Sequence, residues 1–252
     1  MRKVRALVVT GFGINCEEET AAAYRLAGAE AVIAHLNDLF LAKVRLHDFD
    51  ILHLPGGFSF GDDLGSGKVL ANKMKFKRLS TGERLFDELT GFLAGGGFIL
   101  GICNGFQALV KLGLLPNIRG DFEPEATLTR NNSARFEDRW VKCSVAPQGS
   151  PFLTGLSMVD LPVRHGEGKL VFRDAEVENK VTELGLNCMT YVDADGNPTA
   201  DYPANPNGAS LNCAGLRDPS GRVLGMMPHP EAFLSLYNHP DWPRMKRLGL
   251  VK

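Results

Sequence analysis

The sequence lacks cysteine pairs, an excess of charge of either sign, and long apolar runs. Its five cysteines are Cys16, Cys103, Cys143, Cys188 and Cys213, and no two of them form a C-x-x-C pair. This spacing argues against a disulfide framework and against a zinc site. It therefore favours a reducing cytoplasm as the compartment. The 28 basic and 29 acidic side chains leave a net charge of −1. Neither nucleic acid nor an anionic membrane is therefore expected as the main partner.

The most apolar segment, residues 92–106, is only 15 residues long and contains five glycines. A transmembrane helix needs about 20 apolar residues, so this segment is better explained as a buried strand with its turns. The amino-terminal segment begins with basic residues, but its apolar stretch is too short for a signal peptide. We therefore expect a cytoplasmic protein without a membrane anchor.

The first 115 residues alternate between strand-like and helix-like patterns. The predicted strands are residues 4–9, 31–35, 50–54 and 98–102, and the predicted helices are residues 17–27, 39–46, 82–93 and 105–112. Such alternation implies parallel strands joined by right-handed crossovers, with helices on both faces. The first half therefore predicts the α/β class, with a mostly parallel central sheet flanked by helices.

The second half has a different pattern. Residues 126–129 and 139–145 read as strands, and residues 211–216 and 222–227 read as two strands of a hairpin. These segments predict a mixed or antiparallel extension of the sheet. A long polar loop, residues 193–208, is of a kind that is usually functional or mobile. No stretch resembles an interdomain linker, so we expect residues 1–252 to form a single domain.

One segment predicts a catalytic nucleophile. An apolar strand runs into Gly101-Ile102-Cys103-Asn104-Gly105, which is the G-x-S-x-G nucleophile elbow with cysteine in place of serine. The glycines are needed because side chains two residues from the nucleophile would collide in so tight a turn. At a helix N-terminus the thiolate of Cys103 is favoured, and the N–H of Asn104 would face an oxyanion. The alternative is a buried structural cysteine in a glycine-rich turn.

A thiolate that attacks an amide needs a proton carrier for the leaving amine, and His229 fits this role. Pro228 and Pro230 restrain the backbone around it to extended conformations. Residues two apart in an extended chain point the same way, so Glu231 can hydrogen-bond the imidazole and fix its tautomer. The alternative is an unrelated loop histidine followed by a glutamate at a helix start.

The other histidines are weaker candidates for the base. His35 and His53 lie in predicted strands, which favours packing, whereas His47 and His239 lie in polar loops or helix ends, which favours solvation. His165 is the rival to His229. It begins the segment His165-Gly166-Glu167-Gly168, whose glycines predict a tight loop that exposes polar groups. A purely structural turn is the alternative.

With these motifs the sequence resembles the class I, or triad, glutamine amidotransferases. More closely, it is similar to the glutaminase subunits of phosphoribosylformylglycinamidine synthase, an enzyme of de novo purine synthesis. The elbow and the His-Pro-Glu ending indicate only the superfamily. The segments that point to the subfamily are residues 13–17 (Gly-Ile-Asn-Cys-Glu), 55–62 (Pro-Gly-Gly-Phe-Ser-Phe-Gly-Asp), 165–168, 205–208 (Asn-Pro-Asn-Gly) and 224–231 (Leu-Gly-Met-Met-Pro-His-Pro-Glu).

The resemblance implies a flavodoxin-like fold and a glutaminase mechanism. Cys103 would attack the side-chain amide of glutamine, giving a γ-glutamyl thioester and ammonia. His229 would shuttle protons in both half-reactions, and Glu231 would orient it. The sequence differs from the family pattern in three places. They are Ala232, where arginine is common, the segment Gly65-Ser66-Gly67, and residues 121–142, which look more like the long single-chain synthases. These differences bear on which synthetase is the partner and leave the glutaminase chemistry unchanged.

The resemblance also implies roles for residues around the nucleophile. Gly57 and Phe58 would complete the oxyanion hole with Asn104, and Gly56 and Gln107 would line the glutamine pocket. The alternatives are a simple strand-ending turn for residues 55–58 and a solvated side chain for Gln107. Asn15 and the loop of residues 205–208 would face a partner.

The partner implied by the resemblance is an ATP-dependent synthetase that amidates formylglycinamide ribonucleotide, with or without a small accessory subunit. The sequence contains no G-x-x-x-x-G-K-[ST] loop, so we expect no cofactor and no metal in this chain, with ATP and Mg²⁺ on the partner. The alternatives are another class I amidotransferase subunit, a cysteine hydrolase or peptidase on a related fold, and a non-catalytic interaction module. Glu231 argues against the hydrolase, and the intact triad argues against the module.

Overall fold

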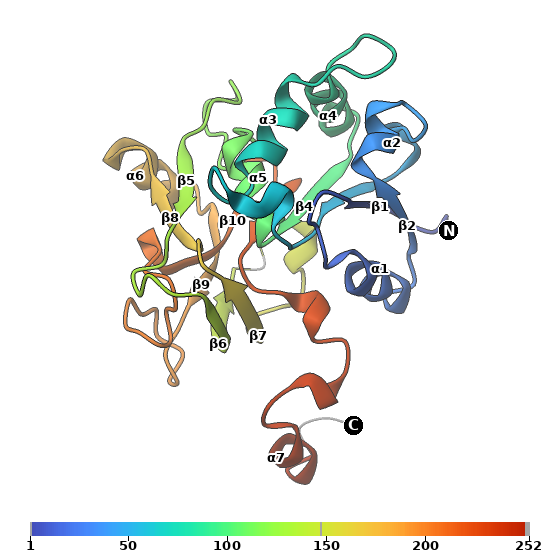
Figure 1. Ribbon diagram of the computed structural model, residues 1–252. Helices are drawn as coiled ribbons and strands as arrows, with labels where there is room; N and C mark the ends of the chain where they lie inside the picture. The colour runs from blue at the N-terminus through green and yellow to red at the C-terminus, as the bar shows by residue number, and fades with distance from the viewer. Residues whose placement is uncertain (1, 147, 250–252) are drawn as a thin grey trace.

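The computed structural model describes residues 2–146 and 148–249 (Figure 1). Five strands of its main sheet pair in parallel, in the order β2-β1-β3-β4-β11. They are β1 (Arg5–Thr10), β2 (Glu30–His35), β3 (Ile51–Leu54), β4 (Phe98–Ile102) and β11 (Val223–Met226). The predicted parallel sheet is therefore confirmed.

The sheet continues from β11 with antiparallel strands in the order β10-β9-β6-β7. They are β6 (Glu137–Val145), β7 (Met158–His165), β9 (Asn187–Tyr191) and β10 (Cys213–Arg217). A separate two-stranded sheet pairs β5 (Ala126–Thr129) with β8 (Lys169–Phe172). The predicted antiparallel extension and the hairpin of β10 and β11 are confirmed.

Helices cover this sheet. The α-helices are α1 (Glu17–Leu26), α2 (Leu36–Phe40), α3 (Lys68–Phe76), α4 (Leu85–Ala94), α5 (Asn104–Lys111), α6 (Ala175–Glu183) and α7 (Trp242–Arg247). Short 3-10 turns are η1 (Leu46–Asp48), η2 (Ser59–Asp62), η3 (Pro151–Leu153), η4 (Ser210–Asn212), η5 (Pro230–Ala232) and η6 (Leu236–Asn238). Residues 6–9 of β1 are all fully buried. Because neighbouring residues of a strand face opposite sides, this burial shows that both faces of the sheet are covered there.

Some predicted boundaries were wrong. The helix expected at residues 39–46 is α2, which ends at Phe40, because the chain turns at Ala42 with a left-handed φ of 54°. Helix α3 was not predicted, although its buried Leu70, Ala71 and Met74 have helical spacing. Strands β7, β8 and β9 and helix α6 were also not predicted.

The parallel half of the sheet positions the chemistry. Strands β3, β4 and β11 are neighbours and run in the same direction, so their carboxyl ends meet at one edge. The chain leaves these ends through the segments that carry Gly57, Cys103 and His229. This is the edge at which open α/β sheets bind their ligands.

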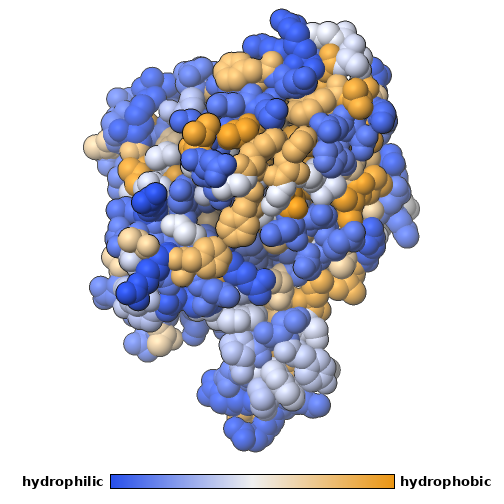
Figure 2. Space-filling model, viewed as in Figure 1, coloured by the Kyte–Doolittle hydropathy of each residue, from blue (hydrophilic) through white to orange (hydrophobic). Residues whose placement is uncertain are grey.

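After η5 the carboxyl-terminal segment packs Phe233 and His239 on Trp140 of β6 and extends from the body of the molecule. In Figure 1 it forms a protruding arm that ends in α7, and in Figure 2 the arm is hydrophilic to neutral in hydropathy. Among residues 2–146 and 148–249, every helix is too short or too polar to span a bilayer.

The elbow packing predicts a sharp penalty for adding one methyl group. A Cβ at Gly105 would lie 1.9 Å from the carbonyl oxygen of Leu54, so β3 and α5 would have to separate. We expect Gly105→Ala to lower the free energy of unfolding by about 3 kcal/mol or more. The matched control is Gly91→Ala within α4, where the nearest neighbouring atom would lie 3.9 Å away. Chemical denaturation of both variants is the measurement, and equal stabilities would contradict the packing.

Candidate active site

Cys103 occupies a strained turn between β4 and α5. Its φ of 49° and ψ of −103° lie outside the ordinary regions for a residue with a side chain. A Cβ at Gly101 would lie 2.8 Å from the backbone of Gly105, and one at Gly105 would strike Leu54. The two glycines therefore allow strand, turn and helix to pack closely, and the structure has the geometry of a nucleophile elbow.

His229 lies beside this turn and is paired with Glu231. The Nδ1–H of His229 donates to Glu231 Oε1 at 2.6 Å, and both side chains are buried. The backbone N–H of His229 donates to Pro162 O at 2.8 Å, which fixes the segment against β7. The expected pairing of these two side chains is thus present, with the tautomer that leaves Nε2 for the cysteine.

The electrostatics favour a protonated imidazole. Burial lowers the pKa of His229, but the negative charge of a Cys103 thiolate and the hydrogen bond to Glu231 outweigh burial. The net effect raises the pKa of His229 to about 12. An imidazolium held between a thiolate and a carboxylate is the arrangement that cysteine nucleophiles require.

The thiol of Cys103 has a second contact. In its thiol form the Sγ can donate to the carbonyl oxygen of Arg164 at 3.4 Å. Within the described part of the chain, Nε2 of His229 has no hydrogen-bond partner. The sulfur and the imidazole are therefore loosely engaged in this structure. Catalytic hydrogen bonds commonly tighten only when substrate binds.

An oxyanion formed at Cys103 has two free backbone donors nearby. In the described part of the chain, the N–H groups of Gly57 and Asn104 donate to no other group. The N–H of Phe58 instead donates to Gly13 O at 2.8 Å. The structure therefore favours Gly57 and Asn104 as the oxyanion donors and leaves the Phe58 amide engaged elsewhere.

The predicted substrate residues Gly56 and Gln107 have other surroundings than expected. A Cβ at Gly56 would lie 2.7 Å from Cε1 of His229, so this glycine makes room for the imidazole. Gln107 is buried; its Nε2 donates to Glu167 O at 2.7 Å, and its Oε1 accepts from Asn104 Nδ2 at 3.0 Å. Both residues are buried beside the catalytic segments, and their contact with the substrate stays a prediction.

Gln107 belongs to a polar network around the start of α5. Asn104 Oδ1 accepts from the backbone N–H of Ser59 at 3.2 Å, and Glu167 Oε2 accepts from that of Ser66 at 3.1 Å. Burial raises the pKa of Asp62, which accepts a hydrogen bond from Ser66. The segment after β3, the elbow helix and the loop after β7 are thus tied together.

His165 is not placed to serve as the base. It is buried, and its Nδ1 lies 3.1 Å from Asn131 Oδ1. Burial and the positive charge of His229 lower the pKa of His165 to about 4. The predicted exposed loop is wrong at this residue, which is the last of β7. Asn131 also accepts from Gly168 N at 2.9 Å, so the glycine-rich segment has a structural role.

The remaining histidines divide as follows. His53 is buried with Nδ1 3.0 Å from Tyr24 Oη, and burial lowers its pKa to about 4. His35 is half-buried and accepts from Asn37 N at 3.0 Å, and His47 is exposed. Packing of the first two and exposure of the third were predicted correctly. The predicted solvation of His239 was wrong, because its ring packs on Trp140 with ring centroids 4.6 Å apart.

A pocket of about 300 Å³ opens at the nucleophile. Its lining includes Cys103, His229, Gly57 and, from segments not assigned to the site in the sequence, Cys16 and Arg164. Arg164 is the residue before His165 at the end of β7, which was not predicted as a strand. Cys16 could have been predicted at the site, because it lies in residues 13–17, a segment that resembles the family pattern.

Exposed aromatic rings form the rim of this pocket. Phe58 and Phe136 are 48% and 52% exposed, line the pocket, and have ring centroids 6.2 Å apart. Phe12, also exposed, stacks on Phe60 at 4.6 Å. Figure 2 shows apolar side chains gathered across the middle of one face, amid hydrophilic surroundings. Exposed apolar patches of this kind mark interaction surfaces.

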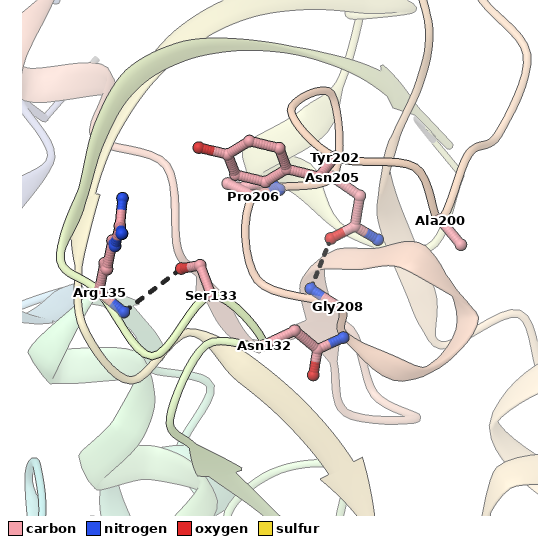
Figure 3. A pocket seen from close by; sticks show the side chains of 8 residues that line it. All are labelled: Asn132, Ser133, Arg135, Ala200, Tyr202, Asn205, Pro206 and Gly208. Carbon is pink, nitrogen blue, oxygen red and sulfur yellow. Dashed lines mark hydrogen bonds between the residues drawn. The ribbon is translucent and has the colours of Figure 1, made fainter.

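A larger pocket, of about 430 Å³, has neither Cys103 nor His229 in its lining (Figure 3). Asn132, Ser133 and Arg135 line one side of it, and Tyr202 and the loop of residues 205–208 line the other. Asn205 Oδ1 accepts from Gly208 N at 2.9 Å, and Asn207 Nδ2 donates to Tyr191 Oη at 3.1 Å. Asn205 and Asn207, which were predicted to face a partner, are therefore buried and hold their own loop. Asn15, predicted with them, is exposed and lines the pocket at Cys103, so its role stays a prediction.

One group of three side chains in the described residues has donor atoms close enough to consider for a metal. Atoms of Cys16, His229 and Glu231 lie within 4.8 Å of one another. The short Nδ1···Oε1 hydrogen bond already joins two of these donors. The group is better explained as a proton-transfer unit than as a metal site.

Comparisons with known proteins agree with this geometry. A family model described as the CobB/CobQ-like glutamine amidotransferase domain matches residues 3–251. The phosphoribosylformylglycinamidine synthase subunit PurQ of Dehalococcoides mccartyi is 45% identical over 244 residues, which cover 96% of this chain and 91% of the relative. Subunit PurQ of Methanococcus maripaludis is 42% identical over 247 residues, covering 97% and 88%.

Solved structures show the same fold. A chain of the PurLQS structure from Thermotoga maritima superposes with a TM-score of 0.71 at 28% identity, covering 100% of both chains. A glutamine amidotransferase of Thermotoga maritima gives a TM-score of 0.54 at 14% identity, covering 99% of this chain and 85% of that one, which shows the fold alone. The chain is a glutamine amidotransferase and belongs to the family of PurQ subunits.

Proposed function

We propose that this chain is the glutaminase subunit of phosphoribosylformylglycinamidine synthase. It releases ammonia from glutamine at Cys103 and passes it to an ATP-dependent synthetase partner. That partner converts formylglycinamide ribonucleotide to formylglycinamidine ribonucleotide in purine synthesis. The observation that carries the proposal is the strained Cys103 elbow beside the buried His229–Glu231 pair. The match to a glutamine amidotransferase domain supports the substrate class, and the names of the PurQ relatives support the subunit role.

The first half-reaction forms a thioester. The thiolate of Cys103 attacks the side-chain carbonyl carbon of glutamine, and the N–H groups of Gly57 and Asn104 stabilise the oxyanion. His229 gives its proton to the amide nitrogen, the C–N bond breaks, and ammonia leaves. Glu231 holds the imidazole in the required tautomer throughout.

The second half-reaction restores the enzyme. Neutral His229 takes a proton from water, and the resulting hydroxide attacks the thioester carbonyl. The C–S bond breaks, glutamate leaves, and the thiolate and imidazolium re-form. No net oxidant or cofactor is needed for either step. ATP and Mg²⁺ are required only to activate the acceptor, and we place both on the synthetase partner.

The synthetase is expected to dock over the aromatic rim of the pocket. The exposed rings of Phe58 and Phe136 lie at the opening through which glutamine enters and ammonia leaves. A synthetase that covered these two rings would bury apolar surface and would also exclude water from the active site. The five cysteines are free thiols, which supports a cytoplasmic location for the complex.

Removing the nucleophile should separate the two activities of the assembled synthetase. We expect Cys103→Ala to lower glutamine-dependent product formation at least about 1,000-fold, because thioester formation is lost. Product formation from added ammonia should stay within about twofold of the wild type, because the partner's site is intact. The measurement is the rate of product formation with each nitrogen source. Equal loss of both activities would mean that Cys103 is structural.

A chemical trap distinguishes an amidotransferase from a general cysteine hydrolase. We expect a glutamine analogue with an electrophilic diazoketone in place of the amide to label Cys103 stoichiometrically, as measured by mass spectrometry of the intact chain. Excess glutamine should protect the thiol, whereas an unrelated peptide amide should not. Labelling that glutamine does not slow would argue for a different substrate.

Substitution on the rim tests the docking surface. We expect Phe136→Ser to weaken binding of the synthetase about 10-fold, because a large exposed ring is lost from the interface. The matched control is Tyr237→Ser, since Tyr237 is 63% exposed but lies on the carboxyl-terminal arm. The affinities can be measured by titration calorimetry of the purified subunits. The same affinity for both variants would place the interface elsewhere.

A further inference from the structure

The pocket at Cys103 contains two side chains of opposite charge that the proposed reaction does not use. They are Glu19, in the first turn of α1, and Arg164, the last residue but one of β7. Cys103 and His229 line the same pocket and act on the amide end of glutamine. The reaction chemistry therefore says nothing about what holds the other end of the substrate.

The strand register directs the side chain of Arg164 toward the pocket. Arg164 lies directly opposite Asp138 of β6 in the antiparallel pair, so these two side chains share one face of the sheet. Phe136, two residues before Asp138, projects on the same face, and it lines the pocket. Val163 and His165, the neighbours of Arg164, are buried on the other face. The guanidinium therefore extends on the pocket side of the strand.

The guanidinium of Arg164 is available to bind an anion. The carbonyl oxygen of the same residue lies 3.4 Å from Sγ of Cys103, so the side chain starts close to the nucleophile. Its Nε lies 3.7 Å from Asp138 Oδ1, in a loose ion pair whose side chains are 52% and 69% exposed. Among residues 2–146 and 148–249, its two terminal nitrogens have no hydrogen-bond partner. Such a group can bind a carboxylate through two parallel hydrogen bonds.

The carboxylate of Glu19 is also available. In the same helical turn, Glu17 Oε1 accepts from Thr10 Oγ1 at 2.7 Å, so Glu17 has a structural role. Glu19 is exposed, and in the described part of the chain its carboxylate makes no hydrogen bond or ion pair, either with Arg164 or with another group. The two opposite charges therefore line one pocket of about 300 Å³ without being in contact.

These two charges match the head group of free glutamine. At neutral pH glutamine carries an α-ammonium and an α-carboxylate at the end opposite the side-chain amide. When the amide is at Cys103, the head group lies toward the opening of the pocket, where Glu19 and Arg164 are exposed. A small number of polar groups on a pocket wall is enough to fix the orientation of a ligand and to give specificity.

We propose that Arg164 and Glu19 are the residues that give the site its specificity for free glutamine, with Arg164 binding the α-carboxylate and Glu19 the α-ammonium. This inference rests on the proposed glutaminase function, which names the substrate. The head group does not react, so both contacts are equally strong in the ground state and in the transition state. They therefore lower KM and leave kcat unchanged. Glutamine side chains of proteins, whose α groups are in peptide bonds, are disfavoured as substrates.

The test measures glutamine-dependent product formation by the assembled synthetase with Arg164→Met or Glu19→Gln. We expect each substitution to raise KM for glutamine about 10-fold, because one charge-assisted contact is lost, and to leave kcat within about twofold. Two glutamine analogues then assign the charges. The first, 4-aminobutanamide, lacks the α-carboxylate, and the second, glutaramate, lacks the α-ammonium. Arg164→Met should leave kcat/KM for the first analogue unchanged, and Glu19→Gln should leave kcat/KM for the second unchanged.

The chain offers a matched control for each substitution. Glu18→Gln makes the same change at the exposed neighbour of Glu19, which is outside the lining of the pocket. Asp138→Asn removes the ion pair of Arg164 but keeps the guanidinium, so it separates an effect on the two strands from a contact with substrate. Both controls should keep KM for glutamine within about twofold of the wild type.

Three results would overturn the assignment. The first is a KM for glutamine within about twofold of the wild type in either test variant. The second is an analogue that loses as much activity as glutamine, since the altered side chain would then not meet the missing charge. The third is weaker binding of the synthetase with unchanged discrimination between glutamine and the analogues, which would place these charges in the partner interface.

The remaining outcomes are also covered. Arg164→Gln replaces the methionine variant if that protein fails to assemble. Failure of the Cys103→Ala prediction would overturn the proposed function, whereas failure of the analogue experiment with an intact Cys103→Ala result would overturn only the assignment of the head-group contacts. The two failures are therefore distinguishable.

Discussion

The site depends on one constraint: β3, β4 and β11 are adjacent and parallel, so that three chain segments leave the sheet at the same point. The glycines of the elbow make that convergence close. Gly105 packs its backbone on Leu54, which brings α5 against the end of β3. A methyl group at Gly105 would push α5 away from the end of β3, and with it Asn104 away from the segment that carries Gly57.

Much of this could be predicted from the sequence because the strongest signals were local. The elbow is a five-residue pattern, and the pairing of His229 with Glu231 follows from two prolines and the period of an extended chain. The parallel strands were found because they are apolar, short and separated by amphipathic segments. These features require no knowledge of long-range contacts.

The rest could not be read locally. Gln107 and Gly56 were expected at the substrate because their segments resemble the family pattern, but the groups they contact, Glu167 and His229, come from distant segments. His165 read as an exposed loop because its glycines gave no sign that Asn131 would enclose the ring. Phe58 fits the family pattern for an oxyanion donor, yet its amide is engaged by Gly13, which only the folded chain brings near.

One further feature bears on how the enzyme could be switched on. The carbonyl that takes the thiol hydrogen of Cys103 belongs to Arg164, on the outermost strand of the antiparallel extension. An edge strand has a neighbour on one side only, so it can shift without disturbing the centre of the sheet. Because the N–H of His229 donates to Pro162 O on the same strand, a partner that pulled on β7 would free the sulfur from its resting contact and move the base with it. Idle turnover of glutamine would then be held in check by a wall of the pocket rather than by the nucleophile itself.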